Sequence, residues 1–225
     1  MPIVSDEYSQ IDILEWVTDF NSFRRWTDTD GYPEKCRIWW LQGRVWVDMT
    51  REEIFTHVLL KSEFTCTLGQ IVQDDELGMI LAYGLFISNV QGDFAGKPDG
   101  TFISATSMRS VGIRFITGTS GEFVEIQGSP DMVLEVVVSN SSVHMDTVVL
   151  RKAYWEAGIQ DYWLVDAREA PPSFDIFRHT SKGYVASRKQ DSWIRSNVFG
   201  KAFKLTQQIN GLGQPEFNLL VRPLA

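Results

Sequence analysis

Short apolar runs separated by glycine and proline fill most of the chain and predict many strands and few helices. The strongest run covers residues 131–139, where six apolar side chains surround one charge, Glu135. A continuous apolar strand of this kind is usually buried on both faces of its sheet. A helical pattern at about 146–157, ending at Gly158, leads to a second buried run at 161–167. We therefore expect a β-α-β unit with a right-handed crossover.

The rest of the pattern predicts an α/β protein with a mixed central β-sheet flanked by helices. We expect a single domain over residues 1–225, with a core at about 35–190, an N-terminal helix and a C-terminal β-rich extension. The further predicted elements are a helix at 7–20, two strands around a glycine turn at 37–48, a helix from Thr50 to about Leu68 with a Thr50–Glu53 capping box, an apolar strand run at 79–90, a hairpin of 113–116 and 122–126, and a meander of 174–179, 184–189 and 192–196.

Composition supports a folded protein and excludes several classes. Apolar residues make up 44% and charged residues 22% of the chain, which is enough for a real core. No apolar run is long enough to predict a membrane-spanning helix, and the first residues do not resemble a signal peptide. Cys36 and Cys66 stand far apart and predict neither a disulfide framework nor a zinc site. These features indicate a cytoplasmic protein.

The formal net charge is −8, but it is unevenly distributed. Residues 178–204 contain seven basic residues and one acid, Asp191. An acidic protein is a poor non-specific DNA binder, although a local basic face can contact phosphate. The alternative is a solvated β-ribbon that carries alternating charges.

Two acidic residues are candidates for chemistry. Glu135 lies inside a buried strand, where an ionised carboxylate is costly unless it is paired or binds a metal. A metal ligand and a structural ion pair are both open for it. A hard cation needs a second carboxylate, and Asp99 in the sequence K-P-D-G is a good candidate. Asp99 could equally be an ordinary turn residue, and Asp131 competes for the same role.

His57 is the third candidate. Glu53, His57 and Lys61 are spaced four residues apart on the predicted helix, so they share one face. That face either lines a cleft or is simply solvated. The sequence contains no nucleophile elbow, Walker loop, dinucleotide fingerprint or H-E-x-x-H motif, so no other enzyme class has a motif to support it.

Four segments in this order resemble the Uma-two family, a bacterial group with a restriction-endonuclease-like fold in the PD-(D/E)-x-K nuclease superfamily. They are P-D-G at 98–100, S-P-D-M-V-L-E-V-V-V-S at 129–139, D-T-V-V-L-R-K-A-Y-W-E-A-G-I at 146–159 and D-Y-W-L-V-D at 161–166. The resemblance covers roughly residues 35–190, and the last three segments make it specific.

The resemblance implies a metal-dependent endonuclease that hydrolyses DNA phosphodiester bonds. Asp99, Glu135 and the main-chain carbonyl of Val136 are then the ligands of Mg²⁺ or Mn²⁺. His57 matches a histidine that is often found on the first core helix of the family. DNA is the implied partner, and a homodimer is implied because superfamily members often dimerise.

One departure concerns the catalytic lysine. The superfamily has Lys two residues after the Glu, where this chain has Val137. The family usually carries this Lys on the following helix, where this chain has Leu150. Arg151 and Lys152 lie next to that position and are candidate substitutes, each rotated from it around the helix axis. The sequence therefore predicts a weakened endonuclease or, alternatively, an inactive nuclease-fold module that acts in binding or regulation.

Overall fold

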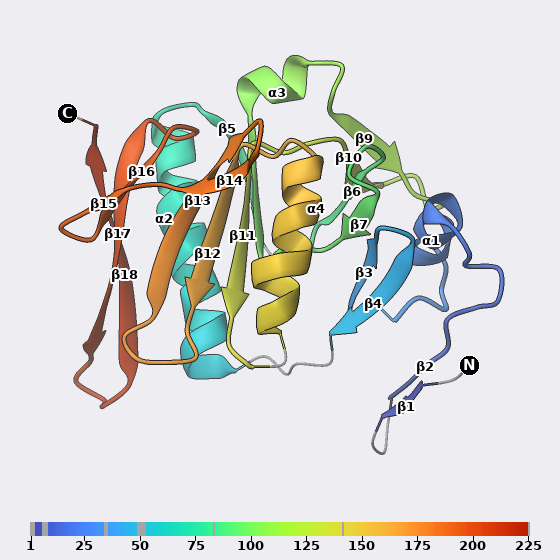
Figure 1. Ribbon diagram of the computed structural model, residues 1–225, viewed down its shortest axis with the longest axis horizontal. Coiled ribbons are helices and arrows are strands. Elements are labelled where there is room, and N and C mark those ends of the chain that lie inside the picture. The colour runs from blue at the N-terminus through green and yellow to red at the C-terminus, as the bar shows by residue number, and fades with distance from the viewer. Residues whose placement is uncertain are drawn as a thin grey trace.

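The computed structural model describes residues 3–5, 9–33, 36–48, 53–82, 84–140 and 142–224. Its strands form three larger sheets, with a two-stranded ribbon of β1 (Ile3–Ser5) and β2 (Ser9–Ile11) near the N-terminus (Figure 1). The α/β class is confirmed at this level. The described residues are richer in strands than expected, and they do not form one central sheet flanked by helices.

The first sheet, called the central sheet below, contains the strongest predicted strand. Strands β11 and β12 pair in parallel, from Met132 opposite Asp161 to Val137 opposite Asp166, as expected for a β-α-β unit. All other pairs are antiparallel, so the sheet is mixed. Its strands, in spatial order, are β14 (Gly183–Ala186), β13 (Ser173–Thr180), β12 (Asp161–Asp166), β11 (Met132–Val137), β8 (Gly100–Ser104) and β5 (Gly78–Ala82).

The second sheet, called the side sheet below, contains both predicted N-terminal strands and the predicted hairpin. The apolar run at 79–90 was expected to be one strand, but it contributes β5 to the central sheet and β6 to the side sheet. The chain changes sheet around Gly84, whose φ of 98° suits glycine. The strands in order are β4 (Arg44–Asp48), β3 (Arg37–Leu41), β7 (Phe94–Gly96), β6 (Phe86–Asn89), β10 (Phe123–Gln127) and β9 (Arg114–Thr117).

The third sheet is C-terminal. The predicted meander divides between two sheets, because β13 and β14 extend the central sheet whereas the next strands begin the third one. That sheet consists of β15 (Lys189–Gln190), β16 (Trp193–Ser196), β17 (Lys201–Ile209) and β18 (Pro215–Pro223). Its long hairpin holds the helix beside it, since the N–H of Leu219 donates to Glu63 Oε1 at 2.7 Å.

Two long helical segments begin with π-helical turns. The first starts after Glu53, whose carboxylate accepts the N–H groups of Phe55 and Thr56, and it continues beyond the predicted end at Leu68. Thr50, the other half of the predicted capping box, lies outside the described residues. The helical elements are α1 (Phe20–Thr27), η1 (Ile54–Val58), α2 (Leu59–Asp74), α3 (Ala105–Arg109), η2 (Met145–Leu150) and α4 (Arg151–Glu156). No helix in the described part of the chain has both the length and the apolar character needed to cross a membrane.

The predicted helix at 7–20 is wrong. Residues 9–11 form β2, and the helix of this region begins only at Phe20. Asp19 and Ser22 form a reciprocal capping box, with the N–H of Ser22 donating to Asp19 Oδ1 at 2.8 Å. The capping box therefore indicates the start of the helix correctly, whereas the apolar residues spaced three apart did not.

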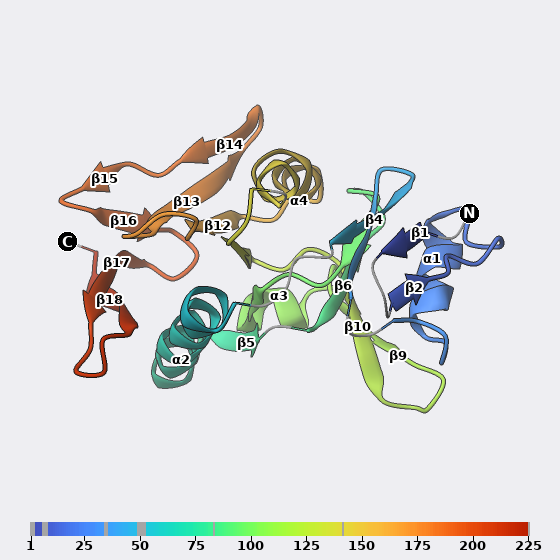
Figure 2. The ribbon, with the colours of Figure 1, turned by 90° about the horizontal axis from the view of Figure 1, so that it is seen from below.

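The central sheet has a hydrophobic core on each face. One core packs against α2 and the C-terminal sheet, and Phe64, Trp163 and Phe203 are fully buried in it. The other packs against α4 and the side sheet, with Trp39 and Tyr154 buried in it. Figure 2 shows α2 and α4 on opposite sides of β11 and β12. Strand β11 therefore needs apolar side chains on both faces, as its sequence predicts.

Asp161 is a buried acid that joins the central sheet to the C-terminal sheet. Its Oδ2 on β12 accepts the hydroxyl of Ser196 on β16 at 2.5 Å. Burial raises the pKa of Asp161 to about 6, from an ordinary value of 3.8. The folded state therefore retains a proton that the unfolded chain releases. The contribution of the protonated Asp161 to the free energy of unfolding is therefore fully present below pH 4 and is lost as the pH rises through about 6.

We predict that Asp161→Asn flattens the pH dependence of stability in this window. The wild type should lose about 2–3 kcal/mol of unfolding free energy from this group between pH 4 and pH 7. Urea unfolding across that range measures the slope, with Asp175→Asn on β13 as the control. Equal slopes for wild type and Asp161→Asn would contradict the prediction.

Candidate functional site

Asp99 lies directly before β8, and β11 fixes both its main chain and its side chain. Its N–H donates to the carbonyl of Leu134 at 3.1 Å, and its Oδ2 accepts the N–H of Val136 at 2.9 Å. A Cβ on Gly100 would lie 3.3 Å from that of Leu134, so this close approach favours glycine. Asp99 is only 1% exposed. Its burial and its two hydrogen bonds to β11 distinguish Asp99 from an exposed turn residue.

Glu135 and Asp99 converge on one cation, Arg37, although they are far apart in the sequence. Nη2 of Arg37 lies 2.8 Å from Glu135 Oε2 and 3.7 Å from Asp99 Oδ1. The other oxygen of Glu135 accepts the hydroxyl of Tyr154 at 2.5 Å. Glu135 is fully buried. Both acids therefore contact the same guanidinium, and the expected sharing of a metal ion by Asp99 and Glu135 stays a prediction.

His57 and Lys61 reach Asp99 from the start of the α2 segment. His57 Nε2 lies 3.5 Å from Asp99 Oδ2, and Lys61 Nζ lies 3.6 Å from Asp99 Oδ1. Both residues are buried. The polar stripe of this helix therefore faces Asp99 at these two positions, not the solvent. Glu53, the third member of the stripe, caps the helix instead.

Sequence reasoning did not assign roles to four further residues of the site: Arg37, Asp48, Asp146 and Tyr154. Arg37 stands opposite Asp48 in the β3–β4 pair, and its Nη1 lies 3.6 Å from Asp48 Oδ2. Asp146 is 2% exposed, and its Oδ2 has no hydrogen-bond partner in the described part of the chain. Hereafter the carboxylate cluster means Asp48, Asp99, Glu135 and Asp146. A lone Arg beside the apolar run I-W-W was the available signal for Arg37.

The three buried acids of the cluster differ in proton affinity. Burial raises the pKa of Glu135 well above its ordinary value, and Asp99 and Asp146 add to this while Arg37 opposes it. Burial also raises the pKa of Asp146, to about 7. Burial would raise the pKa of Asp99 too, but Arg37, His57 and Lys61 outweigh it and lower that pKa. The predicted rise for at least one acid of the pair is therefore found at Glu135.

The proposed substitutes for the missing lysine lie elsewhere. Arg151 stacks on the ring of Phe177 at 4.1 Å and donates to the carbonyl of Tyr184. Lys152 is exposed, and its ammonium lies 3.6 Å from Glu156. The expectation that Arg151 or Lys152 reaches the site is therefore corrected, because their helix turns them away from it. Leu150 is fully buried in the core beside α4.

Asp131 is also separate from the site. Its carboxylate accepts the N–H of Ser104 at 2.7 Å and the hydroxyl of Ser107 at 2.9 Å. These bonds hold the start of α3 against the end of β8. Asp131 is therefore a structural acid, which leaves Asp99 as the partner of Glu135.

The donor set of the cluster fits a hard divalent cation in its chemistry. All four acids offer carboxylate oxygens, the ligands that Mg²⁺ and Mn²⁺ prefer. Two oxygens, Asp99 Oδ1 and Asp146 Oδ2, are buried without a hydrogen-bond partner among the described residues. As the side chains now lie, however, no three His, Cys, Asp or Glu residues in the described ranges are arranged around one metal position.

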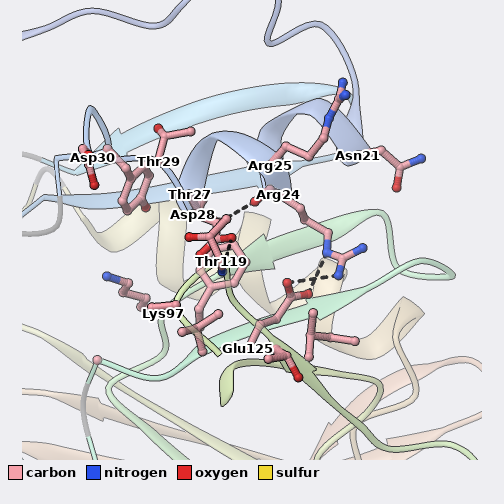
Figure 3. A pocket seen from close by; sticks show the side chains of 17 residues that line it. Asn21, Arg24, Arg25, Thr27, Asp28, Thr29, Asp30, Lys97, Thr119 and Glu125 are labelled. Carbon is pink, nitrogen blue, oxygen red and sulfur yellow. Dashed lines mark hydrogen bonds and ion pairs between the residues drawn. The ribbon is translucent and has the colours of Figure 1, made fainter. Parts of the chain in front are cut away.

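A cavity of about 740 Å³ lies between α1 and the β9–β10 hairpin, and none of the cluster residues lines it (Figure 3). Two of its charged groups pair with each other, and a third accepts a main-chain N–H. Arg24 Nε lies 2.7 Å from Glu125 Oε1, and Asp28 Oδ2 accepts the N–H of Thr119 at 3.0 Å. The carboxylate cluster, where Asp99 Oδ1 and Asp146 Oδ2 lack a hydrogen-bond partner among the described residues, is therefore the stronger candidate site.

A strand-rich α/β fold with acids buried at its middle strands defines the structural class of this protein. The chain matches the model of the Uma2 family, described as "Putative restriction endonuclease", over residues 20–208. Because the match covers most of the chain, the protein belongs to the Uma2 family, as the resemblance indicated. A search of curated proteins found no match.

We predict that Tyr154→Phe destabilises the protein by removing a hydroxyl from a buried carboxylate. The expected loss in unfolding free energy is about 1.5–3 kcal/mol. Tyr184→Phe is the matched control, because that buried hydroxyl donates to a neutral carbonyl, of Ile159, at 2.7 Å. Its expected loss is about 1 kcal/mol. Urea unfolding measures both, and a loss for Tyr154→Phe no larger than that for Tyr184→Phe would contradict the assignment.

Proposed function

We propose that the chain is a metal-dependent endonuclease that hydrolyses DNA phosphodiester bonds at the carboxylate cluster. The observation that carries this proposal is the convergence of two buried acids, Asp99 and Glu135, on one cation. The family description points to the same reaction. In this proposal the central sheet with α2 and α4 is the restriction-endonuclease-like core. The side sheet and the C-terminal sheet are additions to it.

Asp99 and Glu135 are the proposed ligands of Mg²⁺ or Mn²⁺, with the carbonyl of Val136 as the third. When bound, the cation supplies Lewis-acid polarisation of the scissile phosphate and lowers the pKa of a water. The chain's own residues fix the donors. The N–H of Val136 holds one oxygen of Asp99, and the hydroxyl of Tyr154 holds one oxygen of Glu135. Tyr154 is therefore a positioning residue.

Lys61 is the proposed replacement for the lysine that the family usually carries at position 150. Lys61 is buried, and its ammonium lies beside Asp99. The helix that carries it, α2, lies on the opposite side of the central sheet from α4 (Figure 2). A cation there can neutralise charge that develops on the phosphate during attack. His57, which also contacts Asp99, orients that carboxylate.

The alternative, an inactive nuclease-fold module that acts in binding or regulation, rests on one observation. Arg37 already pairs with Glu135, so the buried acid does not require a metal to be retained. Loss of the lysine at position 150 agrees with this alternative. The homodimer implied by the family resemblance is not part of the proposal.

We predict that the protein cleaves supercoiled plasmid and single-stranded DNA in Mg²⁺ or Mn²⁺, and that Glu135→Gln or Asp99→Asn lowers the rate by at least about 10²-fold. The loss follows because either change removes a charged ligand. Gel assays with and without chelator measure the rates, and circular dichroism checks folding. Asp166→Asn is the control, since Asp166 is partly exposed and pairs with Arg168.

Absence of cleavage by the wild type under all of these conditions would favour the inactive module. Cleavage that survives both Glu135→Gln and Asp99→Asn would place the active site elsewhere in the chain.

We further predict that Lys61→Met lowers cleavage by about 10²–10³-fold, because it removes one charge that acts in the transition state. Lys152→Met is the matched control and should change the rate by less than about twofold, since that ammonium is exposed and away from the cluster. If Lys152→Met is the damaging change instead, the helix carrying Lys152 supplies the cation, and Lys61 is only structural.

A further inference from the structure

Arg37 occupies the position between carboxylates where the proposed function requires a metal. Its guanidinium comes from β3 of the side sheet and reaches across to Glu135 and Asp99 in the central sheet. The arginine side chain is 12% exposed, and the side chains of these two acids are fully buried. An ion pair this deeply buried is held by its geometry and hydrogen bonds, and removing one partner is costly.

Both oxygens of Glu135 are already used. Oε1 accepts the hydroxyl of Tyr154, and Oε2 accepts an N–H of Arg37. Each oxygen keeps a second lone pair, so a divalent cation that binds Glu135 directly would share the carboxylate with these two donors. Tyr154 is neutral and can stay beside a metal-bound carboxylate. Arg37 is a cation, and in a buried site it repels another cation at short range.

The charges of the site support the same conclusion. Arg37 is the nearest cation to Glu135 among the described contacts, whereas Lys61 and His57 contact Asp99. Asp48, Asp99 and Glu135 all lie within 3.7 Å of the guanidinium. With Arg37 in place, the cluster is partly neutralised without a metal. With a divalent cation in place, the guanidinium beside Glu135 would repel that cation at short range.

We propose that Arg37 sets the affinity of the site for a divalent cation by competing with it for Glu135 and Asp99. In the metal-free protein the guanidinium acts as the internal counter-ion of the two acids. Metal binding requires it to leave Glu135 Oε2. This inference rests on the proposed function for the location of the metal, but it makes a statement about binding that is independent of cleavage.

The test measures Mn²⁺ binding to the intact chain by isothermal titration calorimetry. Arg37→Met keeps a long apolar side chain and removes the charge. It should bind Mn²⁺ at least about tenfold more tightly than the wild type, whereas Arg37→Lys, which keeps a charge, should gain less. Arg37→Met should also have a lower melting temperature without metal and a larger rise in melting temperature with Mn²⁺.

Arg24→Met is the matched control. Arg24 forms a similar two-pronged, partly buried pair with Glu125, at 2.7 and 3.0 Å, outside the cluster (Figure 3). The Arg24→Met variant should have a lower melting temperature, as Arg37→Met should, but its affinity for Mn²⁺ should stay within about twofold of the wild type. A gain in affinity for Arg24→Met as large as that for Arg37→Met would show a general charge effect and would overturn the proposal.

Unchanged or weaker Mn²⁺ binding by folded Arg37→Met overturns the competition. If the wild type cleaves DNA and this variant gains no affinity, the proposed function stands and the inference fails. If the variant binds Mn²⁺ tightly but no form of the protein cleaves, the inference stands and the nuclease fails. If neither form binds Mn²⁺, both fail.

A second measurement decides the matter if Arg37→Met does not fold. A crystal structure of the wild type saturated with Mn²⁺ should show anomalous density at Glu135, with the guanidinium of Arg37 moved from Oε2. Density at Glu135 with Arg37 still within hydrogen-bond distance of Oε2 overturns the proposal, as does the absence of density.

Discussion

The contact between Arg37 and Glu135 connects the parts of this structure that matter most for its site. It joins the side sheet to the central sheet through one guanidinium, at the place where both layers would otherwise bury unpaired charge. A buried ion pair contributes little net stability over an apolar pair, but it is very costly to break from one side. The arrangement of the two sheets around β11 therefore depends on this pair being complete.

The rest of the site follows from the position of β11. Met132, Leu134 and Val136 face the core against α2, whereas Val133 faces the core against α4. Side chains alternate between the two faces of a strand, so Glu135 faces α4. There its carboxylate accepts the hydroxyl of Tyr154. Asp99 is presented by the neighbouring strand, and the α2 segment adds His57 and Lys61.

Much of this could be predicted from the sequence, because the strongest patterns are local. The buried strand around Glu135 and the β-α-β unit follow from residue type and spacing. Spacing left the roles of Asp99 and His57 open, and the family resemblance singled them out. The division of strands among sheets did not follow, since an apolar run such as 79–90 shows that it is buried but not against which layer. Arg37 was missed for a related reason: its hydrogen-bond partner Glu135 lies about a hundred residues further along the chain, and spacing along one element cannot reveal it.

The substitutes expected for the missing lysine show the same limit. Arg151 and Lys152 are close to position 150 in sequence, but one residue along a helix changes direction by about 100°. Lys61 is distant in sequence and close in space. Proximity along the chain was therefore a poor guide to which cation faces the acids. The spacing of Glu53, His57 and Lys61 on one helix face was a better guide, because it includes the cation that contacts Asp99.

The hydrogen bond between Leu219 and Glu63 has a consequence for how this protein can vary. It links the C-terminal hairpin to α2, the helix that carries Lys61. The hairpin therefore helps to fix the position of α2 along its own axis. Insertions at the tip of the hairpin, around residues 210–213, leave the hydrogen bond between Leu219 and Glu63 intact. A one-residue slip between β17 and β18 would turn the side chains of the slipped strand to the opposite face. Divergence in this extension is thus free in loop length and constrained in strand register.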